Sequence, residues 1–282
     1  MKYGIANKFG QPSQNEIDQI IKYAYNNKIY YFDTAQSYGD SEILLGNALE
    51  LLPNISKVKI ISKLNPTFHK GKISDIVNSV KLSIKKLKVN FLYGFLIHRF
   101  CNSDIMYYSN LFKALKDEGL IEKGGVSVYT IDEAKVVLNN SIFEIIQIPF
   151  NILDRRWVDE KIIEIANEKD IQIFFRSIFL QGLIFLNKDD LIKRSMDWAL
   201  PYIDEFNDLV SKCDSSPMKL SFKLLSNMPG NNIVIMGVDN LEQLKKNIIC
   251  INSLKEENSK SMNWWSLIPS FPEKLLNPTL WI

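Results

Sequence analysis

The sequence predicts a parallel α/β protein, and two observations support that fold class. Seven short runs rich in β-branched and aromatic residues are continuously apolar instead of alternating, as expected for strands covered on both faces of a parallel sheet. Segments with helical periodicity separate these runs, giving repeated strand–helix units of about 30 residues. The apolar runs begin at Ile29, Val58, Phe91, Lys123, Phe143, Ile171 and Asn232.

The helical segments justify a single domain over residues 1–282. The first covers residues 13–27, where Ser13 followed by Glu16 forms a capping-box pattern at the expected N-terminus. Further helical segments follow each strand in turn. The longer segment between Leu186 and Gly230 predicts an extra helix or loop and then a regular outer helix, and it is too small for a second domain.

A parallel α/β chain of this length forms either an open doubly wound sheet or a closed (β/α)8 TIM barrel. None of the 12 glycines forms a G-x-G-x-x-G or P-loop fingerprint, which an open nucleotide-binding sheet would be expected to carry. The chemically capable residues lie at the C-terminal ends of several strands, which is where a barrel places its active site. These two points favour the barrel.

Composition excludes several classes of function. The 282 residues include 34 basic and 32 acidic side chains, net charge +2, without a basic stripe, so we expect no nucleic-acid partner. Cys101, Cys213 and Cys250 are odd in number and far apart, which predicts a reducing compartment and no metal site. No signal peptide or membrane-length apolar run is present, so we expect a cytoplasmic protein away from the membrane, monomeric or weakly homo-oligomeric.

Four polar residues follow successive strands. They are Asp33, Tyr38, Lys63 and His98. Taken singly, each has an ordinary structural explanation: a turn or cap, packing, a solvated amine, a satisfied core histidine. Because neighbouring parallel strands end at the same rim, we expect the four to lie together.

Their chemistry suits the reduction of a carbonyl group. Hydride addition leaves negative charge on the carbonyl oxygen, which needs a proton donor already in place. A tyrosine hydroxyl, with an ordinary pKa near 10, becomes a better acid beside a cation. Lys63 would be that cation, Asp33 its counter-charge, and His98 a hydrogen-bonding partner of the substrate oxygen.

The segment "FDTAQSYGDSEILLGNAL" resembles the D-T-A-x-x-Y-G-x-S-E-x-x-L-G motif of the aldo-keto reductase superfamily. The segments "ISK", "LIHR", "GLIEKGGVSVYT", "IIQIPFNILDRRW", "RSIFLQGLI" and "IMGVDNLEQLKKNI" extend the resemblance in order along nearly the whole chain. It implies a (β/α)8 barrel, NADPH as usual cofactor and a small-molecule carbonyl substrate. It also implies that Tyr38 is the general acid, assisted by Lys63, Asp33 and His98.

The resemblance further implies where the nicotinamide is held. Ser127 and Gln147 stand where the family binds the carboxamide, and Val128 replaces the usual asparagine. Arg176 stands where many relatives stack an aromatic ring, and its planar guanidinium can also stack. The alternative for Arg176 is a structural ion pair, with Asp154 or Glu42 as partner. Ser177 and Gln181 follow as further cofactor-binding positions.

Gly237, Gln243 and Asn247 match the positions that contact the adenosine end. Relatives place basic residues for the 2′-phosphate where this chain has Asp239, which weakens NADPH relative to NADH because a carboxylate repels phosphate and can bind a ribose hydroxyl. Lys245 and Lys246 are nearby cations that would offset the repulsion between Asp239 and a 2′-phosphate.

The start of the barrel differs from the family pattern. The family's first strand precedes the region matched by "YGIANKFGQPS", so residues 2–6 form a short first strand, or the gene begins late, or the barrel is open there. The alternative function is a catalytically weak or inactive relative with a binding or assembly role. A third reading is a lyase or isomerase that uses Lys63 as base.

A few features of the sequence indicate the class of substrate. The wording of several segments is similar to bacterial relatives associated with surface-sugar biosynthesis, and Arg99 and Arg155 near the rim would suit an anionic or nucleotide-linked sugar. Other expected rim residues are Phe9, Phe68, His69 and Phe100. The tail residues Trp264, Trp265 and Trp281 either cover the pocket or, as is commoner, pack against outer helices.

Overall fold

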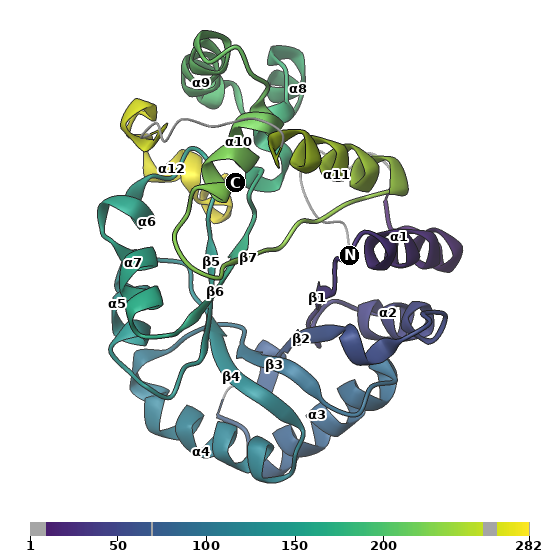
Figure 1. Ribbon diagram of the computed structural model, residues 1–282. Coiled ribbons are helices and arrows are strands. Elements are labelled where there is room, and N and C mark those ends of the chain that lie inside the picture. Colours follow the sequence, from purple (N-terminus) through teal and green to yellow (C-terminus); the bar gives the residue numbers. More distant parts are fainter. Residues whose placement is uncertain (1–9, 69, 256–263, 282) are drawn as a thin grey trace.

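The protein is described from a computed structural model, which covers residues 10–68, 70–255 and 264–281. Seven parallel strands form one sheet in chain order, bent into a nearly closed barrel (Figure 1). The expected seven strands and the barrel fold are therefore confirmed. The strands are β1 Tyr31–Asp33, β2 Lys59–Lys63, β3 Leu92–Ile97, β4 Ile121–Ser127, β5 Ile145–Pro149, β6 Gln172–Arg176 and β7 Ile233–Val234.

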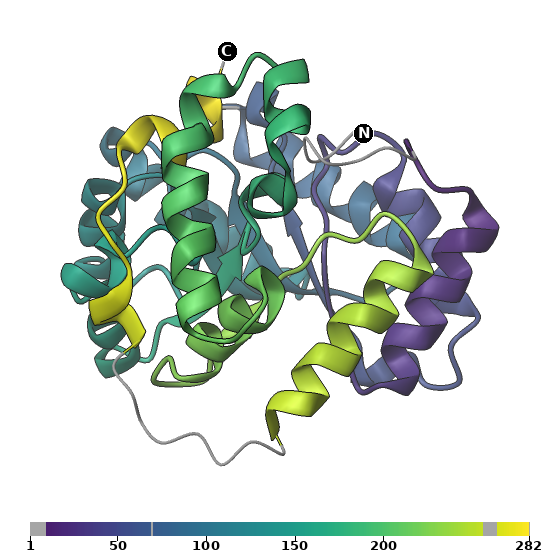
Figure 2. The same cartoon turned by 90° about the horizontal axis from the view of Figure 1, so that it is seen from above.

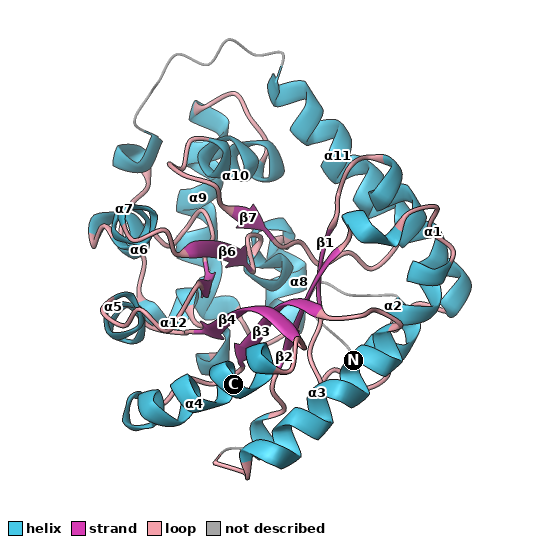
Figure 3. Cartoon of the chain, turned by 60° about the horizontal axis from the view of Figure 1, so that its bottom comes forward, coloured by secondary structure: helices cyan, strands magenta, loops and turns pink. Residues whose placement is uncertain are grey.

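Helices surround the strands on the outside, as Figure 3 shows. The α-helices are α1 Gln14–Asn26, α2 Ser41–Glu50, α3 Ile73–Leu87, α4 Ile105–Asp117, α5 Ile131–Leu138, α6 Arg156–Asp159, α7 Ile162–Glu168, α8 Lys188–Lys193, α9 Leu200–Lys212, α10 Pro217–Ser226, α11 Leu241–Lys255 and α12 Glu273–Leu276. Short 3-10 helices are η1 Ile55–Lys57, η2 Pro66–Phe68, η3 Asn102–Asp104, η4 Leu180–Phe185, η5 Asp197–Ala199, η6 Trp264–Leu267 and η7 Pro278–Leu280. No helix among the described residues is long and apolar enough to cross a bilayer.

Local sequence signals explain where the first elements begin. Ser13 caps α1, and its side chain and that of Glu16 form the reciprocal hydrogen bonds of the expected capping box. The long segment after β6 contains α8 and α9 before α10, which agrees with the expected insertion and outer helix. The helices bury one face each, and the outer core between helices and strands is continuous.

The barrel interior is filled by side chains and is not a channel. A buried cluster inside the strand ring consists of Ile61 from β2, Tyr93 and Leu96 from β3, Ile145 from β5 and Phe174 from β6. All six residues of β3 are buried, whereas β1 and β7 are only half-buried. The two ends of the sheet are thus its least protected strands.

The strand ring is not closed by hydrogen bonds between β1 and β7 in the part of the chain that the structure describes. The helix layer closes instead: α1 and α11 lie side by side (Figure 2) and bury a small apolar cluster of Ile20, Ala24, Leu244 and Ile248. Residues 2–6, the expected short first strand, lie outside the described residues. That expectation therefore stays a prediction.

Candidate active site

Asp33 and Lys63 form a buried ion pair at the ends of two neighbouring strands. Asp33 ends β1 and Lys63 ends β2, which pairs with β1 in parallel. The Lys63 Nζ lies 2.5 Å from Asp33 Oδ2 and donates a second hydrogen bond of 2.9 Å to the Thr34 carbonyl oxygen. The Lys63 side chain is 2% exposed. Such a buried ammonium is tolerable because both contacts are made with negative or partly negative oxygen.

Burial shifts the pKa of Lys63 below its ordinary value. Removal from water favours the neutral amine, the nearby Asp33 carboxylate opposes this by attracting the cation, and the positive charge of Arg176 lowers the pKa further. The ammonium therefore depends on Asp33 for its charge.

Tyr38 and His98 lie beside this ion pair. Tyr38 is in the loop after β1, and His98 directly follows β3. Their ring centroids are 5.8 Å apart in an edge-to-face arrangement, and Lys63 Nζ is 5.2 Å from the Tyr38 centroid. The Ser37 hydroxyl is 3.3 Å from His98 Nδ1. The structure therefore brings together all four residues that the sequence singled out.

The His98 imidazole is neutral at physiological pH. Its burial lowers the pKa to about 4, and the positive charges of Lys63, Arg176 and Arg99 add to that effect, while Asp33 partly opposes it. A neutral imidazole has one ring N–H donor and one acceptor nitrogen. It can therefore present an N–H to a substrate oxygen without bringing another full charge.

Gln147 connects this cluster to the position expected for the nicotinamide. Its Nε2 donates a 2.8 Å hydrogen bond to Asp33 Oδ1, while its buried Oε1 has no partner among the described residues. Ser127 is buried on β4 directly opposite Gln147 on β5. A carboxamide has N–H donors that suit the Gln147 Oε1 and a carbonyl oxygen that suits the Ser127 hydroxyl. These two residues therefore fit the carboxamide of a nicotinamide.

Arg176 forms no ion pair with Asp154 or Glu42, the two acidic residues that would make its role structural. Asp154 instead binds Arg156, with contacts of 2.7 and 2.9 Å. Glu42 accepts a hydrogen bond from Ser62 and lies near Lys86.

The Arg176 side chain lies against the two residues that follow β4. Its guanidinium stacks 4.5 Å over the Tyr129 ring and donates through Nη2 to the Val128 carbonyl oxygen at 3.2 Å. Its buried Nε has no partner in the described part of the chain. The expected stacking of Arg176 on the nicotinamide ring stays a prediction, since the ring that its guanidinium contacts here is that of Tyr129.

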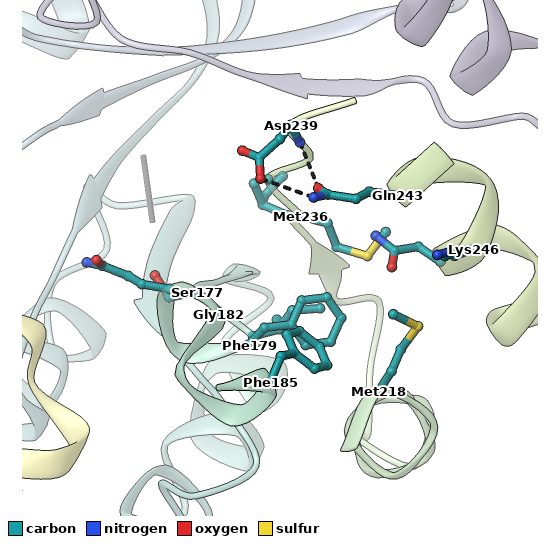
Figure 4. A pocket seen from close by; sticks show the side chains of 14 residues that line it. Ser177, Phe179, Gly182, Phe185, Met218, Met236, Asp239, Gln243 and Lys246 are labelled. Atoms are coloured by element: carbon teal, nitrogen blue, oxygen red, sulfur yellow. Dashed lines mark hydrogen bonds between the residues drawn. The ribbon is translucent and has the colours of Figure 1, made fainter. Parts of the chain in front are cut away.

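A cavity of about 230 Å³ lies between the loop after β6 and the N-terminal half of α11 (Figure 4). We call it the β6–β7 cavity. Six of the nine expected cofactor-binding residues line it: Ser177, Gln181, Gly237, Asp239, Gln243 and Asn247. The remaining three, Ser127, Gln147 and Arg176, are not in its wall, and Arg176 is the chain neighbour of Ser177.

The loop after β6 is held in an uncommon backbone conformation. Ser177, Leu180 and Gln181 have positive φ angles of 59°, 46° and 54°, and Gly182 has 90°. Non-glycine residues adopt this region at an energetic cost, which is often found where a backbone shapes a binding site. No sequence signal at Ser177, Leu180 or Gln181 would have predicted it.

Two expected rim residues make contacts within the protein. Arg155, the N-cap residue of α6, pairs with Asp159 and donates to the Ile268 carbonyl oxygen, so its expected contact with substrate stays a prediction. Phe100 packs against Tyr108 and Phe143.

The tail tryptophans follow the commoner of their two expected fates where the structure describes them. Trp265 is buried against Phe150, and Trp281 donates to backbone oxygens of α12. Phe9 and His69 fall outside the described residues. Within the described ranges, no group of three His, Cys, Asp or Glu could hold a metal ion.

The comparisons with known proteins agree with this architecture. The sequence model of the Aldo/keto reductase family matches residues 1–263. The chain belongs to that family, whose members are nicotinamide-dependent oxidoreductases.

Two curated relatives and one solved structure show the range of similarity. The aldo-keto reductase YhdN of Bacillus subtilis (strain 168) is 23% identical over an alignment of 274 residues that covers 87% of this chain and 82% of that protein. D-arabinose 1-dehydrogenase of Saccharomyces cerevisiae is 31% identical over 135 residues, 43% of this chain and 39% of that one. The holo form of aldo-keto reductase AKR11C1 from Bacillus halodurans superposes with a TM-score of 0.70 at 20% identity, covering 93% of this chain and 88% of that chain.

Proposed function

We propose that this protein reduces an aldehyde or ketone to an alcohol with a nicotinamide coenzyme, and that Tyr38 is the proton donor. The observation that supports this most strongly is the meeting of Tyr38, His98 and the buried Lys63–Asp33 pair at one rim. A bound coenzyme would supply the hydride. The residues of this chain would then position the carbonyl and manage the proton.

Tyr38 would donate its hydroxyl proton to the oxygen that becomes the alkoxide. The Lys63 ammonium beneath its ring favours the phenolate left behind, and Asp33 keeps that ammonium charged in a buried place. The neutral His98 would donate a hydrogen bond to the same oxygen and orient it.

Two groups of residues would hold the coenzyme. Ser127 and the Gln147 Oε1, which has no hydrogen-bond partner among the described residues, suit the carboxamide, and the β6–β7 cavity suits the adenosine end. Because Gln147 also donates to Asp33, the carboxamide contact and the ion pair share one side chain. The family's usual coenzyme is NADPH.

The substrate class that we propose is a small carbonyl compound, with a sugar-derived aldehyde as the leading candidate. The partial similarity to D-arabinose 1-dehydrogenase supports a sugar. Arg99, whose charge acts on His98, remains a residue suited to an anionic substituent. The Arg155 guanidinium is paired with Asp159, so an anionic substituent would have to compete with that ion pair.

Replacement of Tyr38 by phenylalanine separates chemistry from binding. We expect Tyr38→Phe to lower turnover of a test aldehyde by about 10²- to 10⁴-fold, because the proton donor is lost, and to leave coenzyme affinity nearly unchanged. Steady-state kinetics and calorimetric titration of the coenzyme measure the two effects. Tyr23→Phe, a half-buried tyrosine of α1, is the matched control and should change neither.

The same titration tests the alternative of an inactive relative. The observation favouring that alternative is the lack of β1–β7 pairing among the described residues. If the wild type binds coenzyme but reduces no carbonyl, the binding or assembly role is favoured. If neither NADH nor NADPH binds, the reductase proposal is wrong.

A further inference from the structure

The β6–β7 cavity contains one fixed carboxylate, that of Asp239. Its backbone N–H donates to Gln243 Oε1 at 2.8 Å, and its Oδ2 accepts from Gln243 Nε2 at 3.1 Å. The two side chains therefore lie next to each other in the cavity wall (Figure 4). Gln243 is itself anchored, because its backbone N–H donates to Asn240 Oδ1 at 2.9 Å. Asp239 is thus held in place at the start of α11.

We propose that Asp239 makes this cavity select NADH over NADPH. The inference rests on the proposed function, in which the cavity receives the adenosine end of the coenzyme. The two coenzymes differ only in a 2′-phosphate on that end. A carboxylate accepts hydrogen bonds from a ribose hydroxyl and repels a phosphate, as acidic residues do in other dinucleotide sites.

The cations nearby are poorly placed to outweigh Asp239. Lys246 lines the cavity, but its side chain is exposed, so binding a phosphate would require ordering a flexible side chain in a screened environment. Lys245 does not line the cavity, and its Nζ is paired with Glu242 Oε1 at 2.7 Å. No arginine is among the described residues of the cavity wall.

The rest of the wall does not discriminate between the two coenzymes. Phe179, Phe185, Met218 and Met236 offer apolar surface that suits an adenine ring, which both coenzymes share. The amides of Gln243 and Asn247 are neutral and carry no preference for the extra charge. The preference between NADH and NADPH therefore depends on two residues of the wall: Asp239, which repels the 2′-phosphate, and Lys246, which attracts it.

Isothermal titration of the purified chain with NADH and with NADPH tests this inference without any need for a substrate. We expect wild type to bind NADH at least about tenfold more tightly. Asp239→Asn removes the charge but keeps an oxygen for Gln243 Nε2 and for a ribose hydroxyl. In this variant the dissociation constants of NADH and NADPH should differ by no more than about threefold, mainly because NADPH binds more tightly.

The matched control is Asp132→Asn, which removes an acidic side chain from the first turn of another outer helix, α5, away from the cavity wall. It should leave the ratio unchanged. Equal or tighter NADPH binding by wild type overturns the inference and leaves the proposed function standing. An unchanged ratio in Asp239→Asn overturns the role of Asp239. Failure of both coenzymes to bind any of these proteins overturns the proposed function itself.

Discussion

Asp33 is the residue that joins the two parts of the candidate site. One of its carboxylate oxygens binds the Lys63 ammonium and the other accepts the Gln147 amide hydrogen. A single short side chain therefore holds the cation beneath Tyr38 and fixes the orientation of Gln147. Any change at Asp33 is expected to act on both the proton donor and the carboxamide contact.

Lys63→Met is expected to destabilise the protein. It keeps the volume of the side chain but leaves the Asp33 carboxylate, which is 11% exposed, with only Gln147 as hydrogen-bond partner among the described residues, a situation that costs up to about 3–5 kcal/mol. Chemical denaturation followed by circular dichroism measures the free energy of unfolding. The double variant Lys63→Met/Asp33→Asn should recover part of the loss. An unfolding free energy equal to that of wild type for Lys63→Met alone would show that the pair does not form in solution.

His98 is expected to titrate with a pKa of about 4, well below its ordinary value of 6.5. Because the unfolded chain then binds more protons than the folded one between these values, His98 makes the folded state progressively less stable as pH falls from 6.5 to 4. The chain has two histidines, so His98→Gln assigns the signals in an NMR titration. A pKa near 6.5 for His98 would contradict its burial among cations.

At the scale of elements, Gly46 permits the close approach of α2 to α3. A Cβ at this position would lie 2.1 Å from the Lys86 carbonyl oxygen and 2.9 Å from Leu87 Cα. Alanine normally favours a helix over glycine, yet here we expect Gly46→Ala to destabilise the protein by about 1–3 kcal/mol because backbone must shift. Thermal unfolding measures this. Ile43→Ala, exposed on the same helix, should cost much less, and a stabilised Gly46→Ala would refute the close packing.

Much of the element plan was predictable because local signals and tertiary packing agree. The capping pair Ser13 and Glu16 and the apolar strand runs determine where α1 and the strands lie. The sequence alone predicts that Asp33, Lys63 and His98 lie close together, because parallel strands end at one rim. The hydrogen bond between Gln147 and Asp33 could not, since it joins residues 114 positions apart across the barrel mouth.

The arginines show the other limit of sequence reasoning. Arg155 lies in the segment after β5 and Arg176 ends β6, and only the fold shows that the first pairs with Asp159 of α6 while the second lies over the Tyr129 ring. The left-handed backbone of Ser177 and Gln181 also lacks a sequence signal, because glycine is absent from those positions. Side-chain pairing and loop conformation depend on neighbours that are distant in the chain.

At the scale of the whole molecule, both ends of the sheet lead into the candidate site. Asp33 ends β1, and the cavity residue Gly237 follows β7, the two strands that are not paired with each other in the described part of the chain. The proposed coenzyme would therefore be held by residues from both edges of the strand ring, with the contact between α1 and α11 keeping those edges near each other.

Deuterium transfer tests most directly the claim that this protein reduces a carbonyl group with a nicotinamide coenzyme and with Tyr38 as proton donor. The protein is incubated with coenzyme deuterated at the hydride-donating carbon and a short panel of aromatic and sugar aldehydes, and the products are analysed by mass spectrometry. We predict that wild type yields at least one alcohol carrying a single deuterium on the former carbonyl carbon, and that Tyr38→Phe, although it still binds the coenzyme, yields almost none. Deuterium transfer by Tyr38→Phe at the wild-type rate would contradict the role of Tyr38 as proton donor.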